Sequence, residues 1–113
     1  MITIYHNPRC SKSRQGLEIL KNSGQEFEII NYLKDPLSEE KLRQILALLN
    51  IAPIALVRQN ETIWKSDYKG KTLTEDEIIS AMAKHPKLIE RPIVINQDKA
   101  IIGRPPALIA SLL

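Results

Sequence analysis

Cysteine is scarce in this sequence: Cys10 is the only one, so no disulfide can form within the chain. A chain without disulfides is typical of a reducing compartment, and thiol chemistry at Cys10 needs a second thiol from another molecule. No apolar run approaches the length needed to cross a membrane. We therefore expect a cytoplasmic protein that has no membrane partner.

Aromatic residues are also few, at 4% of the sequence. That is too little for the stacking surfaces on which nucleic acids bind, although the net charge is +3. Basic and acidic residues are interspersed, so a small anionic substrate accounts for the positive excess and we predict no nucleic-acid partner. Two histidines and one cysteine offer no metal-ligand spacing. We predict no metal and no bound cofactor.

Strands and helices alternate in the N-terminal part of the sequence. Apolar residues predict a strand at 2–5, a helix at 11–23 that ends at Gly24, and a second strand at 27–32. Two strands joined through one helix form a βαβ unit, for which a right-handed crossover is expected.

The middle of the sequence predicts two further helices with clear start signals. Ser38 is the expected N-cap of a helix whose apolar residues recur at i, i+3, i+4 and i+7. Thr74 and Glu77 have the spacing of a capping box. The helix that follows Thr74 should end near His85, because Pro86 comes next.

The C-terminal part predicts a β-hairpin and a last helix. Apolar runs at 92–95 and 100–102 are separated by a four-residue loop at 96–99, and the last helix is expected to begin at Pro105 and Pro106. With 43% hydrophobic residues in 113 positions, the chain has enough apolar surface for one core. We predict a single α/β domain over residues 1–113 with the thioredoxin-like layout: βαβ, inserted helices and ββα, in a mixed sheet flanked by helices.

Cys10 lies between the first predicted strand and the first predicted helix. Unpaired backbone N–H groups and the positive end of the helix dipole favour a thiolate there, and the same N–H groups would hold an oxyanion. Arg9, Lys12 and Arg14 add positive charge nearby. The pattern indicates a nucleophile beside an anion site. The alternative, a buried structural cysteine, is disfavoured by these polar and basic neighbours.

Four short motifs are spread over the chain: His6-Asn7-Pro8-x-Cys10, Leu56-x-Arg58, Glu90-Arg91-Pro92-Ile93-Val94 and Gly103-Arg104-Pro105. Together they resemble the glutaredoxin-coupled arsenate reductases, a thioredoxin-fold family, over essentially the whole chain. The resemblance implies that Cys10 attacks arsenate. It further implies that three arginines surround the anion: Arg58, Arg91 and Arg104. Guanidinium groups suit a tetrahedral oxyanion because they offer fixed pairs of donors and stay charged.

The resemblance also suggests supporting roles close to the nucleophile. Pro92 is expected to follow a cis peptide bond, as is typical of thioredoxin-like folds; the alternative is an ordinary trans proline at a strand start. His6 is expected to stabilise the thiolate, by its charge or through hydrogen bonds, or else to cap the loop without titrating. Ser13 is expected to cap the helix or to hydrogen-bond the sulfur.

The function that this resemblance implies is arsenate reduction with glutathione as cosubstrate and glutaredoxin as protein partner. Because no second thiol is encoded, the electrons must come from external thiols. One alternative is a non-catalytic regulator of a related branch that binds RNA polymerase. Another is a monothiol glutaredoxin-like oxidoreductase, since residues 10–13 have the C-x-x-S form. The three arginines disfavour the latter, because reducing a disulfide requires no anion cage.

Overall fold

The computed structural model describes residues 1–113, which group into two compact units. The first consists of Met1–Asp35 and Arg91–Leu113, and the second is Pro36–Glu90. No helix in the structure has the length and apolar character that a membrane span requires. The expectation of a single domain stays a prediction.

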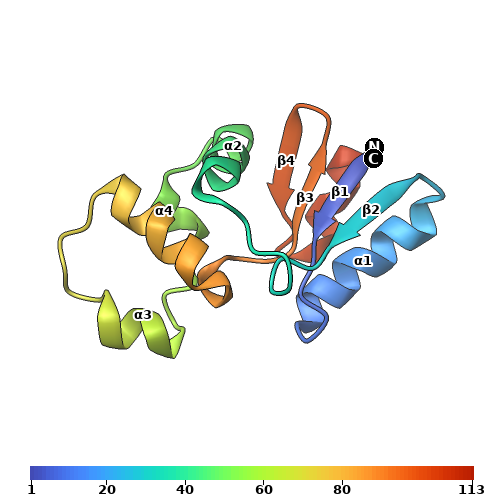
Figure 1. Ribbon diagram of the computed structural model, residues 1–113. Coiled ribbons are helices and arrows are strands. Elements are labelled where there is room, and N and C mark those ends of the chain that lie inside the picture. Colours follow the sequence, from blue (N-terminus) through green and yellow to red (C-terminus); the bar gives the residue numbers. More distant parts are fainter. The chain divides into compact units, whose positions relative to one another are not determined.

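The first unit is built on a four-stranded mixed sheet in the order β2-β1-β3-β4 (Figure 1). β1 (Ile2–Tyr5) pairs in parallel with β2 (Phe27–Ile30) and antiparallel with β3 (Ile93–Asn96). β3 in turn pairs antiparallel with β4 (Lys99–Ile102). The helix α1 (Ser11–Ser23) joins the parallel strands. The predicted βαβ unit and the thioredoxin-like α/β class are confirmed.

One face of this sheet packs against α1 and the 3₁₀ helix η3 (Pro106–Leu112), which lie side by side. Ile4 of β1 is directly opposite Val94 of β3, so both side chains point to the same face. They form a core with Leu20 of α1 and Ile109 of η3, and all four side chains are 0% exposed. Burying each such side chain stabilises the fold by roughly 1.5–3 kcal/mol.

Two glycines allow the chain to pack tightly around Pro92. A Cβ atom on Gly16 of α1 would lie 2.8 Å from Ile109 Cδ1 and 2.9 Å from Pro92 Cγ. A Cβ atom on Gly103 would lie 2.8 Å and 3.0 Å from the same two atoms. These separations are shorter than carbon atoms tolerate, so only glycine leaves the space that the two side chains fill.

The second unit contains the helices α2 (Glu39–Leu49), α3 (Thr62–Asp67) and α4 (Glu75–Lys84). Two short 3₁₀ helices, η1 (Pro53–Leu56) and η2 (Pro86–Leu88), complete it. α4 packs against α2 and against both 3₁₀ helices. Six apolar side chains of this unit are fully buried: Leu42, Ile45, Leu56, Met82, Leu88 and Ile89.

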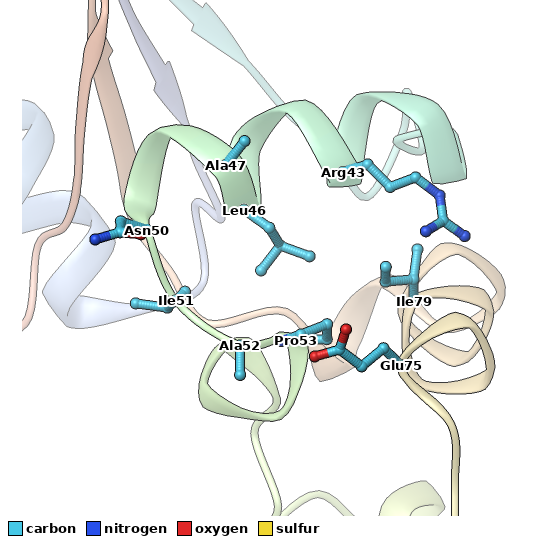
Figure 2. A pocket seen from close by; sticks show the side chains of 9 residues that line it. All are labelled: Arg43, Leu46, Ala47, Asn50, Ile51, Ala52, Pro53, Glu75 and Ile79. Carbon is cyan, nitrogen blue, oxygen red and sulfur yellow. The ribbon is translucent and has the colours of Figure 1, made fainter.

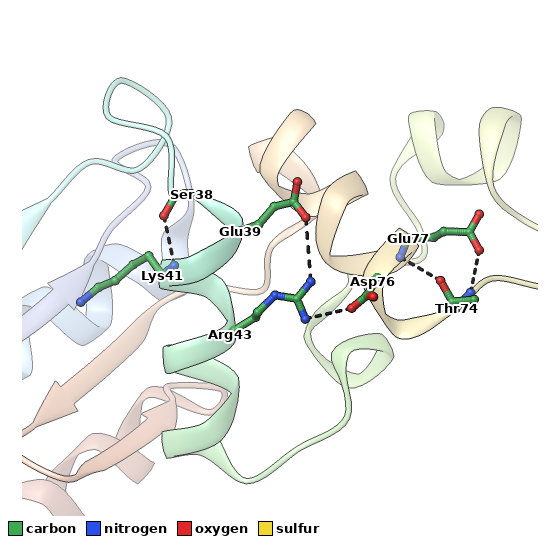
Figure 3. A network of polar contacts seen from close by, with 7 residues as sticks. All are labelled: Ser38, Glu39, Lys41, Arg43, Thr74, Asp76 and Glu77. Atoms are coloured by element: carbon green, nitrogen blue, oxygen red, sulfur yellow. Dashed lines mark hydrogen bonds and ion pairs between the residues drawn. The ribbon is translucent and has the colours of Figure 1, made fainter.

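Local hydrogen bonds start the two longer helices of this unit (Figure 3). The Ser38 hydroxyl accepts a backbone hydrogen bond of 3.0 Å in the first turn of α2. Thr74 and Glu77 form the reciprocal capping box of α4, with bonds of 3.0 and 3.1 Å. Both predicted helix starts are confirmed. Between the helices, Arg43 Nη1 lies 2.9 Å from a carboxylate oxygen of Asp76.

The hairpin differs from the prediction of a four-residue loop. Asn96 pairs with Lys99, so the strands extend by one residue each and the turn consists of Gln97 and Asp98. Gln97 has a φ of 59°, the left-handed conformation that a two-residue hairpin turn requires. The polar residues at 96 and 99 resemble loop residues in the sequence, but backbone pairing next to the turn of a hairpin does not depend on side-chain polarity.

Three further features differ from the sequence-based expectation. β2 ends at Ile30, two residues earlier than predicted. The last helix is 3₁₀ over Pro106–Leu112, although its predicted start at the prolines is close to the observed one. α3 was not predicted, because its six residues are too few to show an apolar periodicity.

Candidate active site

The loop between β1 and α1 carries the predicted nucleophile. Cys10 is the N-cap residue of α1 and has an extended backbone with φ −95° and ψ 123°. Its backbone N–H donates to the carbonyl of Asn7 at 3.0 Å, and its carbonyl accepts from the N–H of Arg14 at 3.0 Å. The helix therefore begins at the half-buried thiol itself.

The surroundings of Cys10 favour the thiolate. Burial acts to raise the pKa of the thiol, but three groups outweigh it. These are the backbone N–H groups of Ser13 and Lys12 and the guanidinium of Arg91, and together they hold the pKa of Cys10 below its ordinary value. The prediction that a helix N-terminus activates this cysteine rests on the same N–H groups.

Two of the three predicted arginines lie at the thiol. Arg104 Nη1 is 4.0 Å from Cys10 Sγ and donates to the carbonyl of Arg91 at 3.4 Å. The peptide bond before Pro92 is cis, and so is the bond before Pro105, which the sequence interpretation does not include. The first unit thus brings together a thiol and two guanidinium groups from three distant segments. Positive charge concentrated at a nucleophile is suited to binding an anion there.

Arg58 belongs to the second unit, where it pairs with Glu90. Arg58 Nη1 lies 3.4 Å from Glu90 Oε1, and both side chains are 22% exposed. The Nε atom of Arg58 is buried and has no hydrogen-bond acceptor. A buried donor without an acceptor is unfavourable, and a bound oxyanion would satisfy it. The role of Arg58 beside Cys10 stays a prediction.

His6 and Ser13 are joined beneath the nucleophile loop. His6 is 6% exposed and Ser13 is 0% exposed. Ser13 Oγ lies 2.7 Å from His6 Nδ1 and accepts the backbone N–H of Asn7 at 3.0 Å. The prediction that Ser13 caps the helix is wrong, because Cys10 takes the N-cap position and the serine side chain turns inward to the loop. The alternative contact with the sulfur comes from the backbone N–H of Ser13 and not from its hydroxyl. No local sequence signal distinguishes this partner from a cap.

The electrostatic environment of His6 disfavours the imidazolium. Burial lowers the pKa of His6, and the positive charges of Arg14 and Lys21 act in the same direction. A smaller opposing effect comes from the backbone of Ser13. A neutral imidazole supplies no positive charge to a thiolate, so of the two modes expected for His6, the hydrogen-bond network fits these surroundings.

A separate hollow of about 470 Å³ lies in the second unit (Figure 2). Its walls come from α2, α4 and the segment around η1, with Leu46, Pro53 and Ile79 among the apolar residues and Arg43 and Glu75 among the charged ones. It contains no cysteine or histidine, so it offers no thiol chemistry. The structure contains no group of three or more His, Cys, Asp or Glu side chains that could hold a metal ion.

Comparison with known proteins relates this chain to a family. The family model for the ArsC family matches residues 5–112. A protein of Haemophilus influenzae named arsenate reductase is 41% identical, covering 99% of this chain and 98% of its own length. The uncharacterized protein YfgD of Escherichia coli is 46% identical over 93% of this chain and 90% of its own. The solved structure of an arsenate reductase from Vibrio cholerae has a TM-score of 0.94 at 41% identity, covering 99% and 97% of the two chains.

Proposed function

This chain belongs to the ArsC family, and from that premise we propose that it is an arsenate reductase with Cys10 as its nucleophile. The observation that carries the proposal is the 4.0 Å approach of Arg104 Nη1 to Cys10 Sγ, where the thiol pKa is lowered despite burial. A nucleophile and an anion-binding guanidinium at one point are what a thiol needs to attack a tetrahedral oxyanion.

In the first step, the Cys10 thiolate attacks arsenic and forms an S–As bond. One arsenate oxygen takes up two protons and leaves as water, and arsenic remains As(V). Arg91 and Arg104 hold the remaining oxygens, and the resemblance to the arsenate reductases gives Arg58 the same role. These guanidinium groups balance the negative charge that arrives with the substrate beside a thiolate.

In the second step, the thiol of glutathione attacks the sulfur of Cys10. The electron pair of the S–As bond stays on arsenic, which leaves as arsenite, As(III). The protein is left as a mixed disulfide with glutathione. A glutaredoxin thiol then attacks the glutathione sulfur and releases the Cys10 thiolate. External thiols are required because the chain has no second cysteine, and this chemistry belongs in the reducing cytoplasm predicted above.

The test is a coupled assay with arsenate, glutathione, glutaredoxin, glutathione reductase and NADPH. We expect NADPH loss that is matched by arsenite formation and is abolished in Cys10→Ser. Intact mass spectrometry of the enzyme during turnover should find the mass of one glutathione on Cys10. Turnover with thioredoxin and its reductase alone, without a glutathione adduct, would refute the glutaredoxin coupling and leave arsenate as the substrate. No arsenite under either condition would refute the reductase itself.

The arginine roles are tested against a reaction that needs no anion site. Alanine at Arg58, Arg91 or Arg104 should lower arsenate turnover by roughly 100-fold, as loss of an oxyanion donor does. Alkylation of Cys10 by iodoacetamide, a neutral reagent, should change far less. The matched control is Arg43→Ala, because Arg43 pairs with Asp76 on the surface of the second unit. Equal losses in both reactions would mean that the arginines maintain the fold.

A further inference from the structure

Ser13 occupies an unusual position for a serine in the first turn of a helix. Its side chain points away from solvent and is 0% exposed. Its hydroxyl contacts two groups of the loop that precedes Cys10, the imidazole of His6 at 2.7 Å and the backbone N–H of Asn7 at 3.0 Å. One buried oxygen therefore connects the start of α1 to the loop from β1.

The chemistry of these two contacts fixes their direction. The N–H of Asn7 can only donate, so Ser13 Oγ is its acceptor. The hydroxyl hydrogen then needs an acceptor of its own, and His6 Nδ1 is the other partner within reach. If Nδ1 carried a proton, the buried hydroxyl hydrogen would have no acceptor, at a substantial energetic cost. Nδ1 is therefore unprotonated, and the imidazole proton is on Nε2.

We propose that Ser13 is the positioning residue of the nucleophile: its hydroxyl holds His6 as the neutral Nε2–H tautomer and ties Asn7 to the first turn of α1. This link to Asn7 fixes the position of the thiol, because the carbonyl of Asn7 accepts a hydrogen bond from the backbone N–H of Cys10 at 3.0 Å. The Asn7 side chain continues the same arrangement by accepting the N–H of Arg9 at 3.0 Å. The loop is thereby held with the sulfur over the N–H groups of the first turn.

The charges around His6 agree with a neutral ring. Arg14 and Lys21 of α1 are the charged side chains that act on it, and both are cations. On the β2 side the His6 backbone N–H donates to the uncharged carbonyl of Ile30 at 2.8 Å. No carboxylate compensates an imidazolium. This inference rests on the proposed function only in taking Cys10 as the nucleophile, and neither experiment below uses arsenate.

The first experiment needs no variant. Long-range ¹H–¹⁵N NMR of protein labelled at histidine nitrogen distinguishes the two neutral tautomers and the imidazolium. We expect His6 to give the pattern of a single Nε2–H tautomer at neutral pH. His85, which is partly exposed, is the internal reference in the same spectrum. An Nδ1–H or doubly protonated pattern for His6 would overturn the proposal.

The second experiment separates a hydrogen-bond acceptor from a charge at position 6. Asparagine can place Oδ1 where His6 has Nδ1 and accept from Ser13, but it cannot become a cation. Below the thiol's titration midpoint, Ser13→Ala and His6→Ala should slow iodoacetamide alkylation of Cys10 by roughly three- to tenfold, through loss of thiolate. His6→Asn should restore most of that rate.

The control is Ser11→Ala, which removes an exposed hydroxyl from the same turn of α1 and should leave alkylation unchanged. Circular dichroism and urea unfolding identify variants that fail to fold, and for those the wild-type NMR spectrum decides. If His6→Asn alkylates as slowly as His6→Ala, then His6 acts on the thiol by its charge and the proposed role of Ser13 is wrong.

Discussion

Replacing Gly16 by alanine tests whether close packing around Pro92 governs the first unit. The added Cβ would lie 2.8 Å from Ile109 Cδ1 and 2.9 Å from Pro92 Cγ, where contact distances for carbon are near 3.5–4 Å. Ile109 is 0% exposed, so its side chain has little space into which to turn. The Pro92 ring can change its pucker, but its bonds to the backbone prevent it from rotating away. Either the helix or the ring must move.

Two effects of opposite sign compete in this variant. Alanine in a helix interior is favoured over glycine by about 0.5–1 kcal/mol. Overpacking a filled core costs about 1–3 kcal/mol. Because one of the two neighbours is a rigid ring, we expect the steric cost to exceed the helix propensity, with a net loss of about 1–2 kcal/mol. For a chain of this size that corresponds to a fall in Tm of roughly 5–10 °C.

The assay is urea unfolding followed by circular dichroism, with the midpoint compared at an unchanged m-value. Ile109→Val supplies a double-mutant cycle, because valine lacks the Cδ1 atom that the new methyl group would meet. The two substitutions should be less damaging together than the sum of their separate effects. Gly24→Ala is the comparison for backbone strain, since its φ is 75° and its surroundings are open. Wild-type stability for Gly16→Ala, or simple additivity in the cycle, would refute the steric reasoning.

Three further outcomes are expected. Burial and nearby cations lower the pKa of His6 in the folded protein, so the unfolded chain takes up the proton first. The contribution of His6 to the free energy of unfolding should therefore be complete above about pH 6.5 and should decline as the pH falls below that value. Urea unfolding midpoints should fall as the pH is lowered from 7.5 to 5. The fall should be smaller in His6→Asn. Ser38→Ala removes the N-cap hydrogen bond of α2 and should cost about 1 kcal/mol in urea unfolding, whereas an unchanged midpoint would show that water replaces the cap. Thiolate absorbance at 240 nm should titrate below the ordinary range for Cys10, and Arg91→Ala should move the midpoint upward, because the guanidinium lowers the pKa of that thiol.

Features encoded by short-range signals could be read from the sequence. The N-caps at Ser38 and Thr74 and the left-handed residue Gly24 each depend on a few neighbouring residues, and the structure has all three where they were predicted. The hairpin turn at Gln97 could not be placed, because strand pairing at its end relies on backbone groups that every residue has. α3 carries too few residues for a periodic pattern.

The same distinction between short-range and long-range features holds for the candidate site. The position of Cys10 at a helix start follows from the residues around it. The approach of Arg104 to that thiol depends on a sheet whose strands are distant in the sequence, so only the resemblance to a known family pointed to it. The contact between Ser13 and His6 escaped prediction for a different reason: serine at a helix start has several common partners, and burial decides among them.

Because β1 lies between β2 and β3 in the sheet, its two strand pairings become possible at different times during translation. Its parallel neighbour β2 leaves the ribosome soon after it, whereas its antiparallel neighbour β3 is among the last segments to be made. A nascent chain that has reached β2 already carries the thiol and its helix start, but neither Arg91 nor Arg104. Joining β1 to β3 closes a loop of most of the chain and is therefore expected to be the slow, late step of folding. Until then the cysteine is a reactive group without its arginines, accessible to any oxidant that meets the unfinished protein.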